Sequence, residues 1–295
     1  MKKWEFELTM NLLERYAALS NEFGSLMTDL CIEHHENEPE LISMHWKHSD
    51  FAVHRSNAMF TLIQSGCYWD AEIIARPLLE CTVRMCFVCY APVETRKELI
   101  REYFEDLYQI NRLEQSEKAK KSRTIIAAQE RSKILLDGMV LTEAEEEEIR
   151  KKWTKKERRA LKQKWSFSEM IRDLDNRVKP LFDQDLFCAF THSYGISSHL
   201  IHADESGIGV ILDREQREDR EKELMNQSHI HNLLDLTLVS SMLMAMGLSI
   251  ALKSRMEEVH DLVNKFNEIH AYKEPVVDEL VDKWADFYKR IDESN

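Results

Sequence analysis

Glycine and proline are scarce in this sequence of 295 residues, with seven and five residues respectively. Alternation of apolar and polar residues with period two is not evident, and no Asn-Gly or Asp-Gly turn joins two strand-like runs. These absences argue against sheets and hairpins. The sequence therefore predicts an all-α protein, and its 43% hydrophobic content is enough for a substantial core.

A secretion signal and a clustered cysteine framework are also missing. The opening M-K-K-W-E-F-E has no apolar core, and the six cysteines lie scattered among apolar residues. Cys81, Cys86 and Cys89 are close together, but a second group of ligands to complete a zinc site is not evident. We expect buried, reduced thiols in a cytoplasmic protein, with no metal and no cofactor.

Long apolar runs are few, and one uncharged run covers Leu236–Leu252. Its seventeen residues are at the lower limit for a membrane span. The many Met, Ser and Thr residues and the charged segment before it favour a central buried helix. We expect no membrane association.

Apolar residues at spacings of three and four predict a series of helices. The expected ranges are 4–34, 39–66, 70–90, 94–136, 166–179, 185–203, 213–255, 257–270 and 277–291. Pro77 either begins or kinks the third of these, and the sequence does not decide between the two. Capping boxes are expected at Thr142 with Glu145 and at Ser166 with Glu169.

The charge pattern predicts a helical hairpin over residues 115–165, inserted into a bundle formed by 1–114 and 166–295. Nine basic residues against one acidic lie between Arg150 and Lys164, in a chain of net charge −13. This run is either a surface for RNA or nucleotide phosphates or a solvated helix stabilised by its own ion pairs. The candidates for phosphate contact are Lys151, Lys155, Arg158, Arg159 and Lys162.

Glycine, histidine and small polar residues concentrate between Tyr194 and Gly209. On a helix, Tyr194, Ser198 and His202 form one stripe, and the glycines beyond suit a tight turn. The stripe is either a proton-transferring or phosphate-holding site, which would include His199 and Asp204, or an ordinary helix end whose histidines favour the negative dipole.

A second stripe is formed by Arg76, Glu80 and Arg84, which lie four residues apart among apolar neighbours. One interpretation is an internal ladder of ion pairs, since charges in an apolar setting are costly unless paired. The other is that these residues form the opposite wall of a polar pocket that includes Tyr194, Ser198 and His202.

The R-P-L-L-E motif at Arg76–Glu80, followed by the Tyr, Ser and His of the later stripe, resembles a bacterial helical family known as a domain of unknown function. That family is similar to the HEPN helical bundles, many of which are RNA-cleaving toxins or phage-defence effectors. The resemblance implies a HEPN-like multi-helix bundle that dimerises. HEPN nucleases carry an Arg four to six residues before the His, whereas the nearest upstream Arg here is Arg177.

Two hypotheses follow for function. The first is a non-catalytic or ex-catalytic interaction or sensor module in a phage-defence or toxin system, with a protein partner or a second copy. The second is a HEPN-like ribonuclease or nucleotide-processing enzyme. In that case His202 is the general acid or base, Ser198 or Tyr194 orients the phosphate, and Arg76 neutralises charge. The two differ in whether Arg76 and His202 converge on an open cleft.

Overall fold

The computed structural model describes residues 3–125, 130–182 and 187–271, with short pieces at 278–279, 281–282 and 284–285. Within these ranges all regular structure is helical, which confirms the all-α prediction. Contacts group the chain into two units. The bundle unit comprises Met1–Tyr90 with Ile171–Asn295, and the inserted unit comprises Ala91–Met170.

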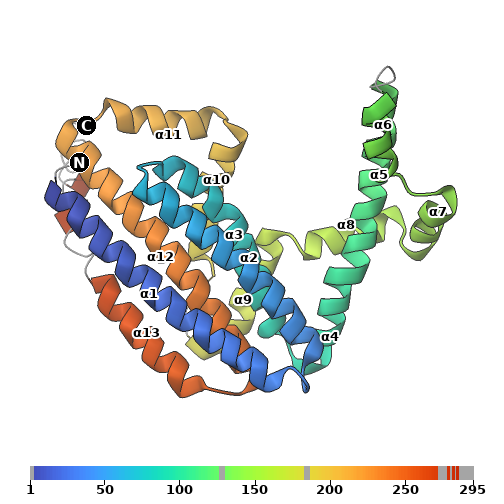
Figure 1. The fold of residues 1–295 in the computed structure, drawn as a ribbon, viewed down its shortest axis with the longest axis horizontal. Helices are drawn as coiled ribbons and strands as arrows, with labels where there is room; N and C mark the ends of the chain where they lie inside the picture. Colours follow the sequence, from blue (N-terminus) through green and yellow to red (C-terminus); the bar gives the residue numbers. More distant parts are fainter. Residues whose placement is uncertain are drawn as a thin grey trace. The chain divides into compact units, whose positions relative to one another are not determined.

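The bundle unit is built from long helices that pack side by side around α12 (Figure 1). Contacts join α12 to α1, α2, α3 and α13, and join α3 to α2 and α10. α9, Phe167–Phe182, begins in the inserted unit and continues into the bundle unit. The other helices are α1 Lys3–His34, α2 Pro39–Gln64, α3 Tyr68–Cys89, α10 Ala189–His202, α11 Glu205–Gln216, α12 Asp219–Leu252 and α13 Met256–His270.

α12 supplies the centre of the core, and its Leu233, Leu234 and Leu243 are completely buried. Fully buried Phe23 and Leu30 come from α1. Among the described helices, α12 alone is long and apolar enough to cross a membrane, but 72% of that apolar window is buried by the rest of the protein. A core helix passes the same test of length and composition, and the burial is what the sequence predicted for this segment.

Pro77 lies inside α3, so of the two alternatives that the sequence left open, it does not begin that helix. Two expected boundaries in the bundle unit are wrong. Pro180 does not separate two helices, because α9 continues through it to Phe182. The expected helix over 213–255 is two helices, since Arg217 adopts an extended conformation and pairs with Asp213 on one side of the break and Glu221 on the other. The expected helix over 277–291 lies largely outside the described residues.

The inserted unit also departs from one continuous helix over 94–136. Its segments are α4 Val93–Arg101, the π-helix η1 Glu102–Asp106, α5 Leu107–Ile125, α6 Glu130–Asp137, α7 Glu143–Lys152 and α8 Lys155–Lys164. In a π-helix the backbone hydrogen bonds join residues five apart, which is the separation of Arg101 and Asp106. These two side chains form an ion pair at 2.7 Å, and the Asp106 carboxylate is buried.

A small core of its own holds the inserted unit together. Leu113 packs with Leu141 and Ile149, and Trp153 covers them. The sequence predicted that the insertion begins at residue 115. Leu113 already belongs to this cluster, and by its contacts the unit begins at Ala91.

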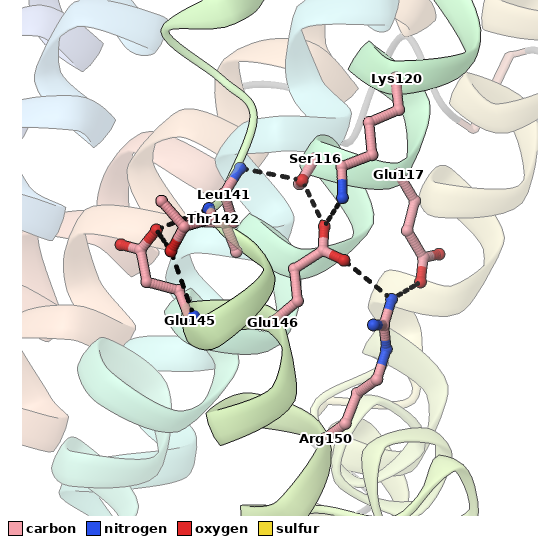
Figure 2. A network of polar contacts seen from close by, with 8 residues as sticks. All are labelled: Ser116, Glu117, Lys120, Leu141, Thr142, Glu145, Glu146 and Arg150. Atoms are coloured by element: carbon pink, nitrogen blue, oxygen red, sulfur yellow. Dashed lines mark hydrogen bonds and ion pairs between the residues drawn. The ribbon is translucent and has the colours of Figure 1, made fainter.

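The first expected capping box is confirmed, because Thr142 accepts from the Glu145 amide while Glu145 accepts from the Thr142 amide (Figure 2). The second is wrong, since the buried Ser166 hydroxyl has no hydrogen-bond partner in the described part of the chain. An unexpected box forms instead at Thr154 with Glu157, where α8 begins.

Candidate functional site

The two polar stripes predicted from the sequence face each other across α3 and α10. Arg76 donates from Nη2 to the Tyr194 hydroxyl at 2.9 Å and from Nη1 to the Ser198 hydroxyl at 3.1 Å. Its guanidinium carbon also lies 4.6 Å from the centre of the Tyr194 ring, a cation–π distance. Arg76 therefore holds two successive turns of α10 against α3.

Glu80 is the shared acceptor of this group, which we call the Arg76 cluster: Arg76, Glu80, Arg84, Tyr194 and Ser198. Its Oε1 accepts from Arg76 Nε at 3.3 Å and from the Tyr194 hydroxyl at 3.3 Å, while its Oε2 accepts from Arg84 at 3.0 Å. Burial is the main cause that raises the pKa of Tyr194, and the negative charge of Glu80 is the second. The positive charge of Arg76 opposes this rise but does not cancel it. Tyr194 therefore keeps its proton and donates a hydrogen bond to Glu80. Both interpretations of the Arg–Glu–Arg stripe describe part of this arrangement.

His202 is not part of the Arg76 cluster. It is the last residue of α10 and is exposed to solvent. Its side chain makes no hydrogen bond or ion pair to Arg76, Tyr194 or Ser198, all of which lie in the described ranges. The helix ends directly after it, because Ala203 takes the left-handed conformation.

His199 and Asp204 form a separate pair at the junction of α10 and α11. His199 Nδ1 lies 2.7 Å from one Asp204 oxygen, and the other accepts from the Gly207 amide at 3.0 Å. Asp204 is therefore the N-cap of α11. The hydrogen bond from the Gly207 amide is the main cause that lowers the pKa of the Asp204 carboxyl, and the hydrogen bond with His199 is the second. These two residues serve the turn between two helices.

The glycines after this turn have a different role from the one expected. Both Gly207 and Gly209 lie inside α11 with ordinary helical backbone, so neither forms a tight turn. A Cβ on Gly207 would lie 2.5 Å from the His199 carbonyl oxygen. The absence of a side chain allows the first turn of α11 to contact the backbone of α10.

A second polar network, buried and not anticipated from the sequence, lies one turn closer to the start of α3. Glu72 accepts from the Ser197 hydroxyl at 2.8 Å and lies 3.1 Å from His229 Nε2. His229 Nδ1 lies 2.8 Å from Arg214 Nη1, and the Arg214 guanidinium stacks 4.1 Å from the Trp69 ring. The four polar residues are between 0% and 8% exposed and come from four different helices, α3, α10, α11 and α12.

The geometry of this buried network fixes the protonation of His229. A guanidinium can only donate, so Nδ1 must be the acceptor, and Nε2 carries the hydrogen that is donated to the Glu72 carboxylate. Neutral His229 thus bridges Glu72 and Arg214 by one hydrogen bond to each. Glu72 lies four residues before Arg76, so the sequence could have placed it on the same polar face of α3. For Arg214 and His229, no comparable spacing in the sequence predicts that they join this network.

Most of the basic run in the inserted unit is paired within that unit. Lys151 pairs with Glu147 at 2.9 Å, as expected for residues four apart, and Lys162 pairs with Glu114 at 2.7 Å. Arg158 donates to the Trp153 carbonyl. Of the candidates for phosphate contact, Lys155 and Arg159 are exposed and have no protein partner among the described contacts. Lys152 pairs at 3.3 Å with Asp106, a residue outside its own helix.

Cysteine and metal-ligand patterns add no further site. Cys31, Cys81, Cys86 and Cys89 are buried and Cys188 is exposed, which corrects the expectation of uniformly buried thiols. Burial raises the pKa of Cys81 to about 12, so this thiol remains protonated. No group of three or more His, Cys, Asp or Glu side chains that could hold a metal occurs in the described ranges.

Comparison with known proteins gives one match. The model of a family of unknown function, DUF5677, matches residues 51–221, a region that includes both the Arg76 cluster and the inserted unit. No curated protein and no solved structure matches the chain.

Proposed function

Because the match covers more than half of its length, the chain belongs to the DUF5677 family, and we propose that it is a non-catalytic helical interaction and sensor module. The observation that carries this proposal is the internal use of Arg76. All three of its nitrogens donate to protein groups, namely Glu80, Ser198 and Tyr194. An arginine that neutralises a phosphate needs donors aimed at the substrate.

The position of His202 also supports a non-catalytic role. A general acid or base acts within hydrogen-bond reach of the group that it protonates. His202 is exposed at the end of α10, and its described contacts include none with the arginine that would neutralise the same substrate. The alternative HEPN-like ribonuclease would require Arg76 to release its partners on α10 when substrate binds.

In this role the Arg76 cluster holds α10 against α3, and other surfaces of the protein bind its partners. In the inserted unit, internal ion pairs neutralise much of the basic run, which favours a protein partner over RNA. The phage-defence or toxin context and the homodimer enter this proposal from the HEPN resemblance of the motifs at Arg76–Glu80 and Tyr194–His202. The cytoplasmic setting enters from the opening residues and the scattered cysteines of the sequence.

The test is expression of the intact chain beside His202→Ala, with growth and RNA integrity scored in the same cells. We expect intact RNA and equal growth for both chains. RNA cleavage by the parent that disappears in His202→Ala would establish the ribonuclease instead. Cleavage that persists in the variant would also overturn a non-catalytic role, and it would exclude His202 as the acid or base.

A further inference from the structure

A cavity of about 600 Å³ lies in the bundle unit, between α1 and α2, with Ser241 and Met244 of α12 also lining it. This volume is within the range of small-molecule sites, about 300–1,000 Å³. It shares no residue with the Arg76 cluster or with the buried network around Glu72.

The two long walls of the cavity differ in chemistry. On α1 the wall is small and polar, because Ser20, Gly24 and Thr28 recur every four residues on one face. On α2 it is aromatic, with Trp46 and Phe60 among the lining residues. Trp46 is 56% exposed, an unusual position for so large an apolar side chain. A flat ring could lie between these walls.

A buried histidine lines the cavity as well. His45 is completely buried, and its Nδ1 lies 3.0 Å from the Ser49 hydroxyl, another lining group. Burial lowers the pKa of His45 to about 4, and the nearby Met244 carbonyl opposes this shift only in part. The imidazole is therefore neutral at physiological pH.

The charge of the lining excludes one class of ligand. Among the residues that the structure describes, no lysine or arginine lines the cavity, and two acidic residues do, Asp29 and Asp50. Asp29 is already paired with Arg255 at 3.2 Å. A phosphate or carboxylate would find no counter-charge here, whereas hydroxyl and amide groups offer many hydrogen bonds to a neutral molecule.

We infer that this cavity binds an uncharged aromatic small molecule, with its ring against Trp46 and Phe60 and its polar group toward Ser49. This inference names the ligand class of the sensor and relies on the proposed function only for its biological role. Binding itself is measured independently of RNA cleavage, so failure of one proposal is distinguishable from failure of the other.

Gly24 provides a clean test of the site. A Cβ at this position meets no atom within 4 Å, and the residue lies in the middle of α1, so a larger side chain can enter the cavity without strain. Gly24→Phe should fill the cavity, and Gly24→Ala should leave it open. The probe is 1-aminoanthracene, which is neutral, with anilinonaphthalene sulfonate as its anionic counterpart.

We expect the intact parent and Gly24→Ala to bind 1-aminoanthracene with similar Kd, and Gly24→Phe to bind at least about tenfold more weakly. Trp46→Phe should remove most of the tryptophan quenching that binding causes, which locates the probe. Thermal melts check that each variant is folded. The inference is overturned if the parent does not bind the neutral probe, if Gly24→Phe binds it as well as Gly24→Ala does, or if the anionic probe binds equally well.

Discussion

Gly207 in α11 approaches the backbone of His199 in α10 so closely that a Cβ would lie 2.5 Å from the His199 carbonyl oxygen. The carbonyl carbon and the next amide nitrogen would lie at 2.7 and 3.0 Å. Backbone atoms cannot move aside as a flexible side chain can. The α10–α11 junction therefore depends on a hydrogen atom at this position.

Gly207→Ala should destabilise the protein by about 1–3 kcal/mol, the usual cost of forcing extra atoms into a packed contact. Gly209→Ala is the matched control, because it lies in the same helix and its Cβ would meet nothing within 4 Å. That change should be neutral or stabilising by up to about 1 kcal/mol, since alanine favours a helix over glycine. Urea unfolding of both variants measures the difference, and equal stabilities would contradict the close approach.

Glu80→Ala should lower the free energy of unfolding by about 1–3 kcal/mol, because two arginines and Tyr194 lose a shared charged acceptor. The value stays below that of a fully buried pair, since the Glu80 side chain is 25% exposed. His202→Ala should change stability by less than about 0.5 kcal/mol, as expected for an exposed residue outside the cluster. A large loss in His202→Ala would show that this histidine supports the fold.

Glu72→Ala should be more damaging than Glu80→Ala, by our expectation costing about 3–5 kcal/mol, because it removes the buried carboxylate to which His229 and, through it, Arg214 are linked. His229 loses its acceptor in the same change, whereas the Ser197 hydroxyl still has the Ser193 carbonyl at 2.8 Å. Chemical denaturation monitored by circular dichroism gives the ranking of the two variants.

Asp70→Ala is the control for Glu72→Ala, since it removes a carboxylate two residues earlier in α3 that is exposed to solvent. It should cost at most about 1 kcal/mol, the usual value for an acidic residue in the first turn of a helix. If Glu72→Ala costs no more than this control, the buried network contributes nothing to stability.

The inserted unit should lose stability in acid because of Glu146. Its carboxylate accepts from Ser116 at 2.7 Å and from Lys120 at 2.8 Å, and Arg150 lies 3.2 Å away (Figure 2). These contacts lower the pKa of Glu146 below its ordinary value of 4.5, and the hydrogen bond from Lys120 has the largest effect. A depressed folded-state pKa means that the stabilisation is present above pH 4.5 and is lost as the pH falls through the lower folded-state value.

The measurement is hydrogen exchange of residues 140–152 in the parent, Glu146→Gln and Glu147→Gln. At neutral pH we expect Glu146→Gln to lower local protection by about 1–3 kcal/mol, and Glu147→Gln, whose carboxylate makes an exposed pair with Lys151, by less than about 1 kcal/mol. The gap between the parent and Glu146→Gln should close in acid. A gap that does not depend on pH would show that the charge of Glu146 is not what stabilises α7.

Local periodicity was enough to predict an all-helical chain and the composition of two polar stripes, but not every helix boundary. Residues four apart share a face of a helix whatever the surroundings, so Arg76 with Glu80 and Tyr194 with Ser198 follow from spacing alone. The sequence also offered the juxtaposition of these stripes as one of two interpretations, because charges in an apolar helix require partners. Contacts between α3 and α10 show that the stripes do meet.

Tertiary structure alone decided which polar residues share a site. His202 has the spacing of the stripe and is the last residue of α10, but its side chain is exposed and its described contacts include none with Arg76. Gly207 is explained by contact with another helix and not by its own backbone conformation. Glu72, Ser197, Arg214 and His229 come together from four helices, and no local pattern records such a meeting because their packing depends on the whole bundle.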